Sequence, residues 1–200
     1  LRGLAMENGL LSLPARFYQP NSRWTTAYSA IYPRLFLQCV QGHKTNSKSP
    51  LVGTGLSYGE LFKENASINY RQFLTLVENS VEVEEDACIA LRAGSLATVG
   101  THGQLGLAML SSRNFGEALT AMTDFGCTRG PFLDLSLSRR DEYCVMQIEI
   151  PQESGDTYVH ILEFVFLCVQ SLIRSVTAHI GLSGRIEFAY PEPAHASQYS

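Results

Sequence analysis

The sequence has little charge, and most of what it has is negative. Charged residues make up 17% of the 200 residues, and the 15 Lys and Arg are outnumbered by 19 Asp and Glu, for a net charge of −4. This balance argues against a chain that grips a polyanion by itself, because phosphate binding needs clustered basic side chains. The hydrophobic fraction of 45% is nevertheless that of a folded protein.

Cysteine is scarce too, and no CxxC pair is present. This excludes a zinc ribbon and gives no sign of a disulfide framework. We therefore expect the cysteines to be small, buried hydrophobic residues of a protein that works in a reducing cytoplasm. The five are Cys39, Cys88, Cys127, Cys144 and Cys168.

Most catalytic motifs are missing as well: the sequence contains no HExxH, GxGxxG or GxxxxGK[ST]. Residues 53–57 resemble a phosphate loop only in their glycines and lack its lysine. No two histidines stand four residues apart, as a metal-binding helix face would need. We expect no enzyme activity, no metal and no cofactor.

A hydrophobic run of membrane-spanning length is also lacking. The longest apolar stretch, residues 159–169, is interrupted by His160 and Glu163, whereas a span needs about 20 apolar residues. Residues 1–6 lack both an initiator Met and a signal-peptide pattern, so we expect the natural chain to begin earlier. The sequence predicts a buried helix and no membrane partner.

Helical patterns occupy the first two thirds of the chain. Apolar residues recur at helical spacing in residues 26–41, and further helices are expected at residues 56–64 and 103–110. Asn69 and Asn114 each precede Gln or Glu by three residues, which is typical of a capping box at a helix start.

Gly94 is expected to end another helix, over residues 87–93, as a left-handed C-cap.

The apolar period then changes to two. Residues 133–137 and 144–150 alternate around a turn at residues 139–142, which predicts an antiparallel hairpin with one face on a core. A long helix over residues 157–179 and a third strand over residues 185–190 follow. The expected fold class is α+β: an N-terminal helical part, then a β-β-α-β unit whose small antiparallel sheet packs on the long helix.

The long helix is apolar nearly all round, so it should be buried on more than one side. One side is expected to cover the sheet, and the other the helical half, a subunit partner or a ligand cavity. The polar pair His160 and Glu163 could orient a ligand or be a satisfied pair on a partly buried helix, with no third group evident for metal or acid–base chemistry. The candidate ligand-binding residues are Tyr143, Gln147, His160, Glu163, Phe164 and Arg174.

Several segments, in order, resemble one family. They are GTGLS at 53–57 with Leu61 and INYRQ at 68–72, DACIALRAG at 86–94, GQLGLAMLSS at 103–112 with FGEAL at 115–119, and RIEFAYPEP at 185–193 with Tyr199. These segments are similar to the N-terminal sensor domain of AraC-type transcription regulators, in the arabinose-binding-type branch that includes regulators of ornithine utilisation. Asn114, Ala87 and the pair 189–190 depart from the family pattern.

The resemblance implies an effector-sensing and dimerisation domain of a bacterial, cytoplasmic regulator. The expected layout is an extended leader at 1–29 and a sensor domain at 30–200, divided into a helical subdomain at 30–128 and a β-β-α-β subdomain at 129–200. The partners it implies are a small-molecule effector, a second copy of the chain, and DNA only through a helix-turn-helix domain beyond Ser200, where we expect the chain to stop inside a final helix. The alternative is a ligand-free oligomerisation or protein-interaction module.

Overall fold

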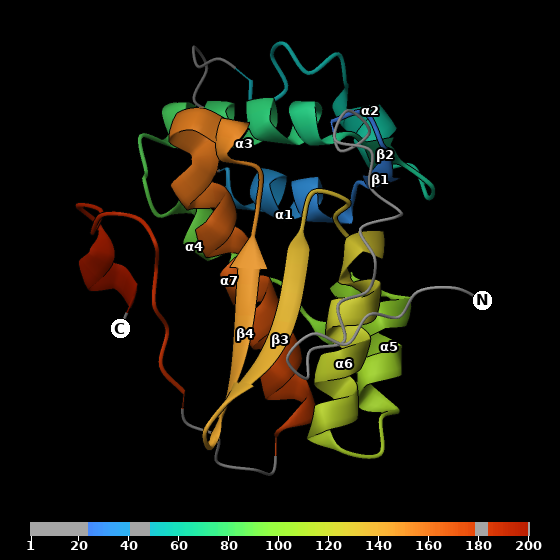
Figure 1. Cartoon of the computed structure of the whole chain (residues 1–200). Helices are drawn as coiled ribbons and strands as arrows, with labels where there is room; N and C mark the ends of the chain where they lie inside the picture. The colour runs from blue at the N-terminus through green and yellow to red at the C-terminus, as the bar shows by residue number, and fades with distance from the viewer. Residues whose placement is uncertain (1–23, 41–48, 179–183, 200) are drawn as a thin grey trace, which may run out of the picture.

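The computed structural model describes residues 24–40, 49–178 and 184–199, so most of the expected leader lies outside the described residues (Figure 1). Helices dominate, and the two sheets are both two-stranded and antiparallel, which confirms the α+β class. The elements in chain order are β1 (Tyr28–Ser29), α1 (Ile31–Cys39), α2 (Tyr58–Leu61), β2 (Ser67–Ile68), α3 (Tyr70–Glu84), α4 (Ile89–Ser95), η3 (Val99–His102), α5 (Gln104–Leu110), α6 (Phe115–Phe125), η4 (Gly126–Thr128), β3 (Asp134–Arg140), β4 (Tyr143–Glu149), η5 (Gln152–Thr157), α7 (Tyr158–Val176) and η6 (Ala196–Tyr199).

Two helices begin where their capping residues predicted. The Asn69 side chain accepts a hydrogen bond from the Gln72 backbone N–H at 3.0 Å, and the Gln72 side chain accepts one from the Asn69 N–H at 3.0 Å. At α6, Asn114 accepts from the Glu117 N–H at 2.9 Å, but the Glu117 carboxylate accepts from the Arg113 N–H instead. Each cap satisfies N–H groups that the helix itself cannot.

The predicted helix end at Gly94 is wrong, because Gly94 lies inside α4. A Cβ at this position would lie 2.7 Å from the Leu167 Cβ and 3.0 Å from the Phe164 carbonyl oxygen. Glycine is therefore needed here for the close crossing of α4 and α7 rather than for a turn.

The predicted hairpin forms, with Leu135 opposite Ile148 and Leu137 opposite Met146. These four side chains are partly buried against the core, while the turn is made at Asp141, whose φ is +55°. This turn is tighter than the predicted turn at 139–142, because residues 139 and 140 belong to β3 and pair with β4. Cys144, which we expected on the inner face, is exposed because it lies beyond the part of the hairpin that the core covers.

The expectation that every cysteine is a small buried residue is wrong. Cys39 and Cys168 are buried, Cys88 is half-buried, and Cys127 and Cys144 are exposed. All are free thiols.

The predicted third strand at residues 185–190 is also wrong: this segment joins neither of the sheets in the described chain. Its Phe188 packs on α7 instead, with its ring 5.9 Å from the Phe166 ring, and it also lies 5.3 Å from the Tyr199 ring of η6. The helix start predicted at residues 194–200 is a single 3-10 turn, η6. We call residues 184–199 the tail.

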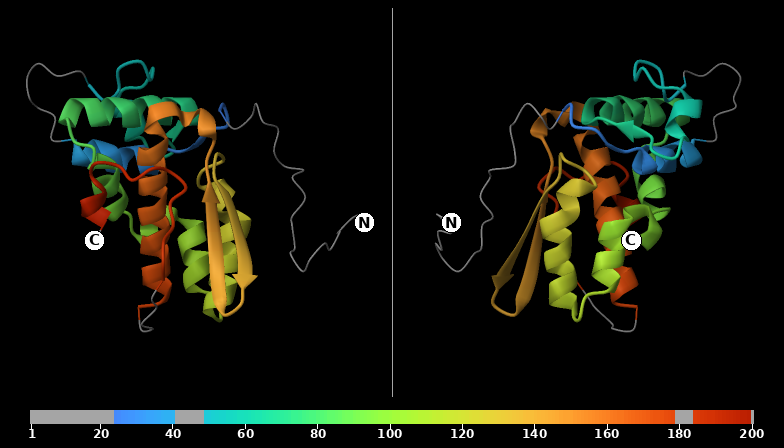
Figure 2. Two further views of the ribbon diagram at one scale, coloured as in Figure 1. Left: turned by 60° about the vertical axis from the view of Figure 1, so that its left-hand side comes forward. Right: turned by 90° about the vertical axis from the view of Figure 1, so that its right-hand side faces the viewer.

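α7 is the central element of the fold. Figures 1 and 2 show it running down from α1 and α3, with α5, α6 and the hairpin on one side and the tail on the other. Its closest packing is against α4. The stretch Ser154–Val176 has the length and composition of a membrane span. Its contacts on several sides are nevertheless those of a core helix, as predicted. The helix ends at Val176, however, before the predicted end at His179.

Candidate ligand-binding site

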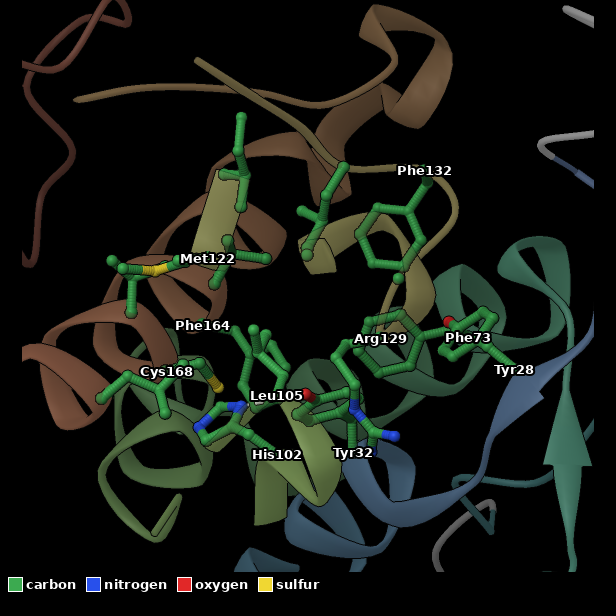
Figure 3. A pocket seen from close by; sticks show the side chains of 17 residues that line it. Tyr28, Tyr32, Phe73, His102, Leu105, Met122, Arg129, Phe132, Phe164 and Cys168 are labelled. Atoms are coloured by element: carbon green, nitrogen blue, oxygen red, sulfur yellow. Dashed lines mark hydrogen bonds between the residues drawn. The ribbon is translucent and has the colours of Figure 1, made fainter. Parts of the chain in front are cut away.

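A cavity of about 40 Å³ lies against α7 (Figure 3). Its walls come from elements far apart in the chain, from β1 and α1 to β3 and α7. Apolar and aromatic side chains make up most of this lining, among them Phe73, Leu105, Met122, Phe132, Leu135, Phe164, Cys168, Val169 and Leu172.

The sequence shapes this cavity in two ways. Phe164, Cys168 and Leu172 follow one another at intervals of four, so α7 turns all three to the same side. Gly126 and Gly130 keep the opposite wall thin, since a Cβ at Gly126 would come within 2.5 Å of the Leu135 Cδ1.

Polar groups gather at one end of the cavity, where Figure 3 shows Tyr32, His102 and Arg129 side by side. The Tyr32 hydroxyl and the His102 Nδ1 are hydrogen-bonded at 3.0 Å. The Arg129 guanidinium lies 5.6 Å from the centre of the Tyr32 ring and donates from Nη2 to the Thr101 carbonyl at 3.2 Å.

Three polar atoms of this lining are buried without a hydrogen-bond partner among the described residues: the Tyr28 hydroxyl, the His102 Nε2 and the Arg129 Nε. Most buried polar atoms in folded proteins are hydrogen-bonded, so three exceptions around one cavity require an explanation. A bound ligand would supply the missing partners.

Burial controls the ionisation of these groups. It lowers the pKa of His102 to about 4, with a further contribution from the Arg129 charge, so the imidazole is neutral at neutral pH. Burial also raises the pKa of Tyr32 to about 12, although Arg129 partly opposes it, and raises the pKa of Tyr28 well above its usual value. Arg129 is thus the charged group of the lining, which contains no Asp or Glu.

A second polar group, the tail cluster, consists of His160, Glu163, His195 and Tyr199. Glu163 is 1% exposed, and its Oε1 accepts hydrogen bonds from the His195 Nε2 and the Tyr199 hydroxyl, both at 2.5 Å. The His160 Nδ1 lies 3.7 Å from the other carboxylate oxygen, beyond hydrogen-bond distance. The cluster therefore fastens the tail to α7.

The net pKa shift of Glu163 is downward. Burial alone would raise this pKa, but the interactions with His160, Tyr199 and His195 together outweigh it. Sequence reasoning missed His195 and Tyr199 as partners. A carboxylate at position 163 of a strongly apolar helix was the available signal, since buried carboxylates need such partners.

The structure distributes the predicted ligand-binding residues over several places. Phe164 lies in the cavity wall, whereas His160 and Glu163 come together in the tail cluster. Arg174 lines a pocket of about 310 Å³ with Ser95 and Gln170, between α4 and α7.

The two predicted residues of the hairpin lie apart from all of these. Tyr143 is 74% exposed, and Gln147 is exposed and donates from Nε2 to the Glu149 carboxylate at 2.6 Å. In the described parts of the chain, no group of three or more His, Cys, Asp and Glu side chains is arranged to hold a metal ion.

Comparison with known families defines the class of protein. Residues 48–200 match the arabinose-binding domain of AraC transcription regulators, an N-terminal domain, and the chain belongs to this family. It is thus a ligand-binding domain of a transcription regulator and not an enzyme.

A particular relative is the ornithine utilization regulator of Pseudomonas aeruginosa, which is 26% identical over 136 residues. The aligned part covers 68% of this chain and 40% of that regulator. The chain therefore spans less than half the length of the relative it matches.

Proposed function

We propose that this chain is the effector-sensing and dimerisation domain of a cytoplasmic AraC-type regulator, and that it controls a DNA-binding domain attached to it in the full-length protein. The observation that carries the proposal is the α7 cavity with its three unpartnered polar atoms. An unsatisfied buried polar group costs about 1–3 kcal/mol, so a ligand that satisfies several of them gains affinity. The arabinose and ornithine in the names of the family and the relative are not assigned to this chain.

α7 connects the cavity to the tail. Phe164 and Cys168 face the cavity, while Glu163, the neighbour of Phe164, holds the tail through His195 and Tyr199. An effector that binds better to one position of α7 would shift the population of tail arrangements. In the full-length protein, the attached DNA-binding domain would respond to this shift.

The exposed side of α5 supports the homodimer part of the proposal. Leu107 and Leu110 are 63% and 50% exposed and stand three residues apart, on neighbouring positions of the helix surface. Apolar side chains in such a position are candidates for burial in a subunit contact. Light scattering of the chain should report a dimer, and Leu107→Glu should convert it to a monomer. A wild-type monomer at high concentration would contradict dimerisation.

The sensor role is tested by thermal unfolding of the purified chain with sugars, amino acids and carboxylic acids. A ligand at 100 times its Kd stabilises the folded state by about 2.7 kcal/mol, which is a measurable rise in Tm. Val169→Phe, which fills the cavity, should abolish the rise, while Val52→Phe at a position 53% exposed should leave it unchanged. If no compound stabilises the wild-type chain, the ligand-free oligomerisation module is the better account.

A further inference from the structure

We infer that a second copy of this chain packs on the exposed strip of α5 about a two-fold axis, so that α5 of one copy lies antiparallel to α5 of the other. The strip consists of five exposed residues, Gln104, Leu107, Ala108, Leu110 and Ser111. This inference rests on the dimerisation part of the proposed function and adds the symmetry of the contact and the residues that meet in it.

The strip lies in the longest stretch of the sequence without charge. Residues 93–112 contain no Asp, Glu, Lys or Arg, and the next longest such stretch, residues 49–59, is about half as long. Burial does not account for this, because Leu96, Leu107 and Leu110 are 42%, 63% and 50% exposed. Depletion of charge on an exposed apolar surface is typical of the centre of a protein–protein contact.

The missing charges favour a second copy of the chain over a different partner. In a two-fold contact each surface meets itself, so any charge near the axis faces the same charge. The chain has a net charge of −4, and two copies therefore repel each other wherever acidic residues come together. α3 exposes Arg71, Glu78 and Glu82, as expected for a helix face in water. Of these two helices, α5 is the one on which two copies can meet without facing like charges.

The spacing within the strip suits an antiparallel contact. Gln104, Leu107, Ala108 and Ser111 stand at positions i, i+3, i+4 and i+7, which form one face of a helix. The centre of this face lies between Leu107 and Ala108, so an axis there places Leu107 of each copy against Ala108 of the other. A large side chain then packs against a small one, which allows the two helices to approach closely.

Within the described chain nothing covers this strip. In the right-hand view of Figure 2, α5 and α6 face the viewer, and no other described element lies in front of them. The first charged residue after α5, Arg113, pairs with Glu117 at 2.7 Å, so it brings no unpaired charge to the edge of the contact. An apolar centre with a polar edge is the usual arrangement of an interface.

The test mixes two variants of opposite charge at Leu107. Leu107→Glu and Leu107→Lys should each be monomeric, with a dimer dissociation constant at least about 100-fold higher than that of the wild-type chain, because like charges meet at the axis. An equimolar mixture should form a heterodimer, since the two charges are then opposite. Light scattering gives the mass, and native mass spectrometry identifies the heterodimer. Val52→Glu and Val52→Lys, at a loop position 53% exposed, are the matched controls and should leave the dimer unchanged.

A cross-linking variant keeps the test decisive if a charge at position 107 prevents folding. Ala108→Cys is made together with Cys127→Ser and Cys144→Ser, which remove the two exposed thiols. It should form a disulfide-linked dimer on mild oxidation, because the axis brings position 108 of the two copies together. Glu78→Cys on α3, in the same background, should remain unlinked.

The outcomes separate the contact surface from dimerisation itself. If both Leu107 variants stay as dimeric as the wild-type chain, the contact lies elsewhere, which overturns this inference and leaves the proposed dimerisation standing. Two monomeric variants that form no heterodimer would overturn the two-fold arrangement. A monomeric wild-type chain, as expected if residues 1–23 or a different protein covered the strip, would overturn the inference and the proposed dimerisation together. The ligand-binding role would still be decided by thermal unfolding.

Discussion

The tail side of α7 buries a carboxylate, Glu163, that accepts hydrogen bonds from His195 and Tyr199, whereas the cavity side buries the Nε of Arg129 without a partner. Both arrangements place polar atoms in the interior, where an unsatisfied group is costly. The tail side also keeps two buried atoms without a partner among the described residues, the Glu163 Oε2 and the His160 Nδ1. The difference is therefore one of role: one side of the helix holds the tail through Glu163, and the other lines a cavity.

The largest expected effect is on the tail side. Glu163→Met leaves His195 and Tyr199 without their shared acceptor and should lower the free energy of unfolding by about 3 kcal/mol or more. Urea unfolding measures this change. Glu187→Met is the control, because Glu187 pairs with Arg185 on the surface with its side chain 73% exposed, and it should have no measurable effect. Equal effects of the two substitutions would remove the contrast between the sides of α7.

The next effect concerns pH on the cavity side. The pKa of His102 is about 4 in the folded chain against 6.5 as its ordinary value, so the unfolded state takes up a proton first as pH falls. The free energy of unfolding therefore contains a contribution from the neutral His102 ring that is fully present above pH 6.5. This contribution should decrease by about 3 kcal/mol as pH falls to 4. Unfolding measured across this range should show a flatter profile for His102→Gln; an unchanged profile would show that His102 is not buried as described.

Glu163 should act in a different pH window. Its pKa is lowered from 4.5 in the folded chain, so its contribution is present above that value and is lost as pH falls through the lower folded pKa. The two sides of α7 therefore separate in an acid titration, His102 first and Glu163 second.

A smaller effect is expected where α4 crosses α7. Gly94→Ala places a methyl group against the Leu167 Cβ and the Phe164 carbonyl, and should destabilise the fold by about 1–3 kcal/mol. Because this crossing supports both sides of the helix, the substitution should lower Tm and weaken ligand binding together. Gly59→Ala has no atom within 4 Å of the new Cβ and should leave both unchanged. An undisturbed Gly94→Ala protein would mean that the helices can move apart freely.

The features that the sequence predicted well are local ones. The cap at Asn69 depends on a residue three positions away, and the hairpin depends on alternating apolar residues on either side of a turn. Burial of α7 on several sides also follows from its composition. Gly94 was misread because the same residue suits both a helix end and a helix crossing, and only the position of Leu167 distinguishes them.

The cavity could not be assembled from sequence patterns. Arg129 follows η4 in a segment without a motif, and its neighbours Tyr32 and Thr101 are distant in the chain. Phe164 was a predicted ligand-binding residue and lies in the wall, but no local signal connected it with Arg129 or His102. Buried polar atoms without a hydrogen-bond partner can be identified only once the positions of all their neighbours are known.

The most direct test of the account is a methyl NMR titration of the chain labelled at methionine with carbon-13. Met122 lines the cavity, whereas Met109 is buried in α5 outside its lining and Met146 lies on the hairpin. Addition of a compound that stabilises the chain in thermal unfolding should move the Met122 signal most and leave Met109 and Met146 close to their original positions. A Met122 signal that stays unchanged when such a compound is saturating would contradict the assignment of the α7 cavity as the ligand-binding site.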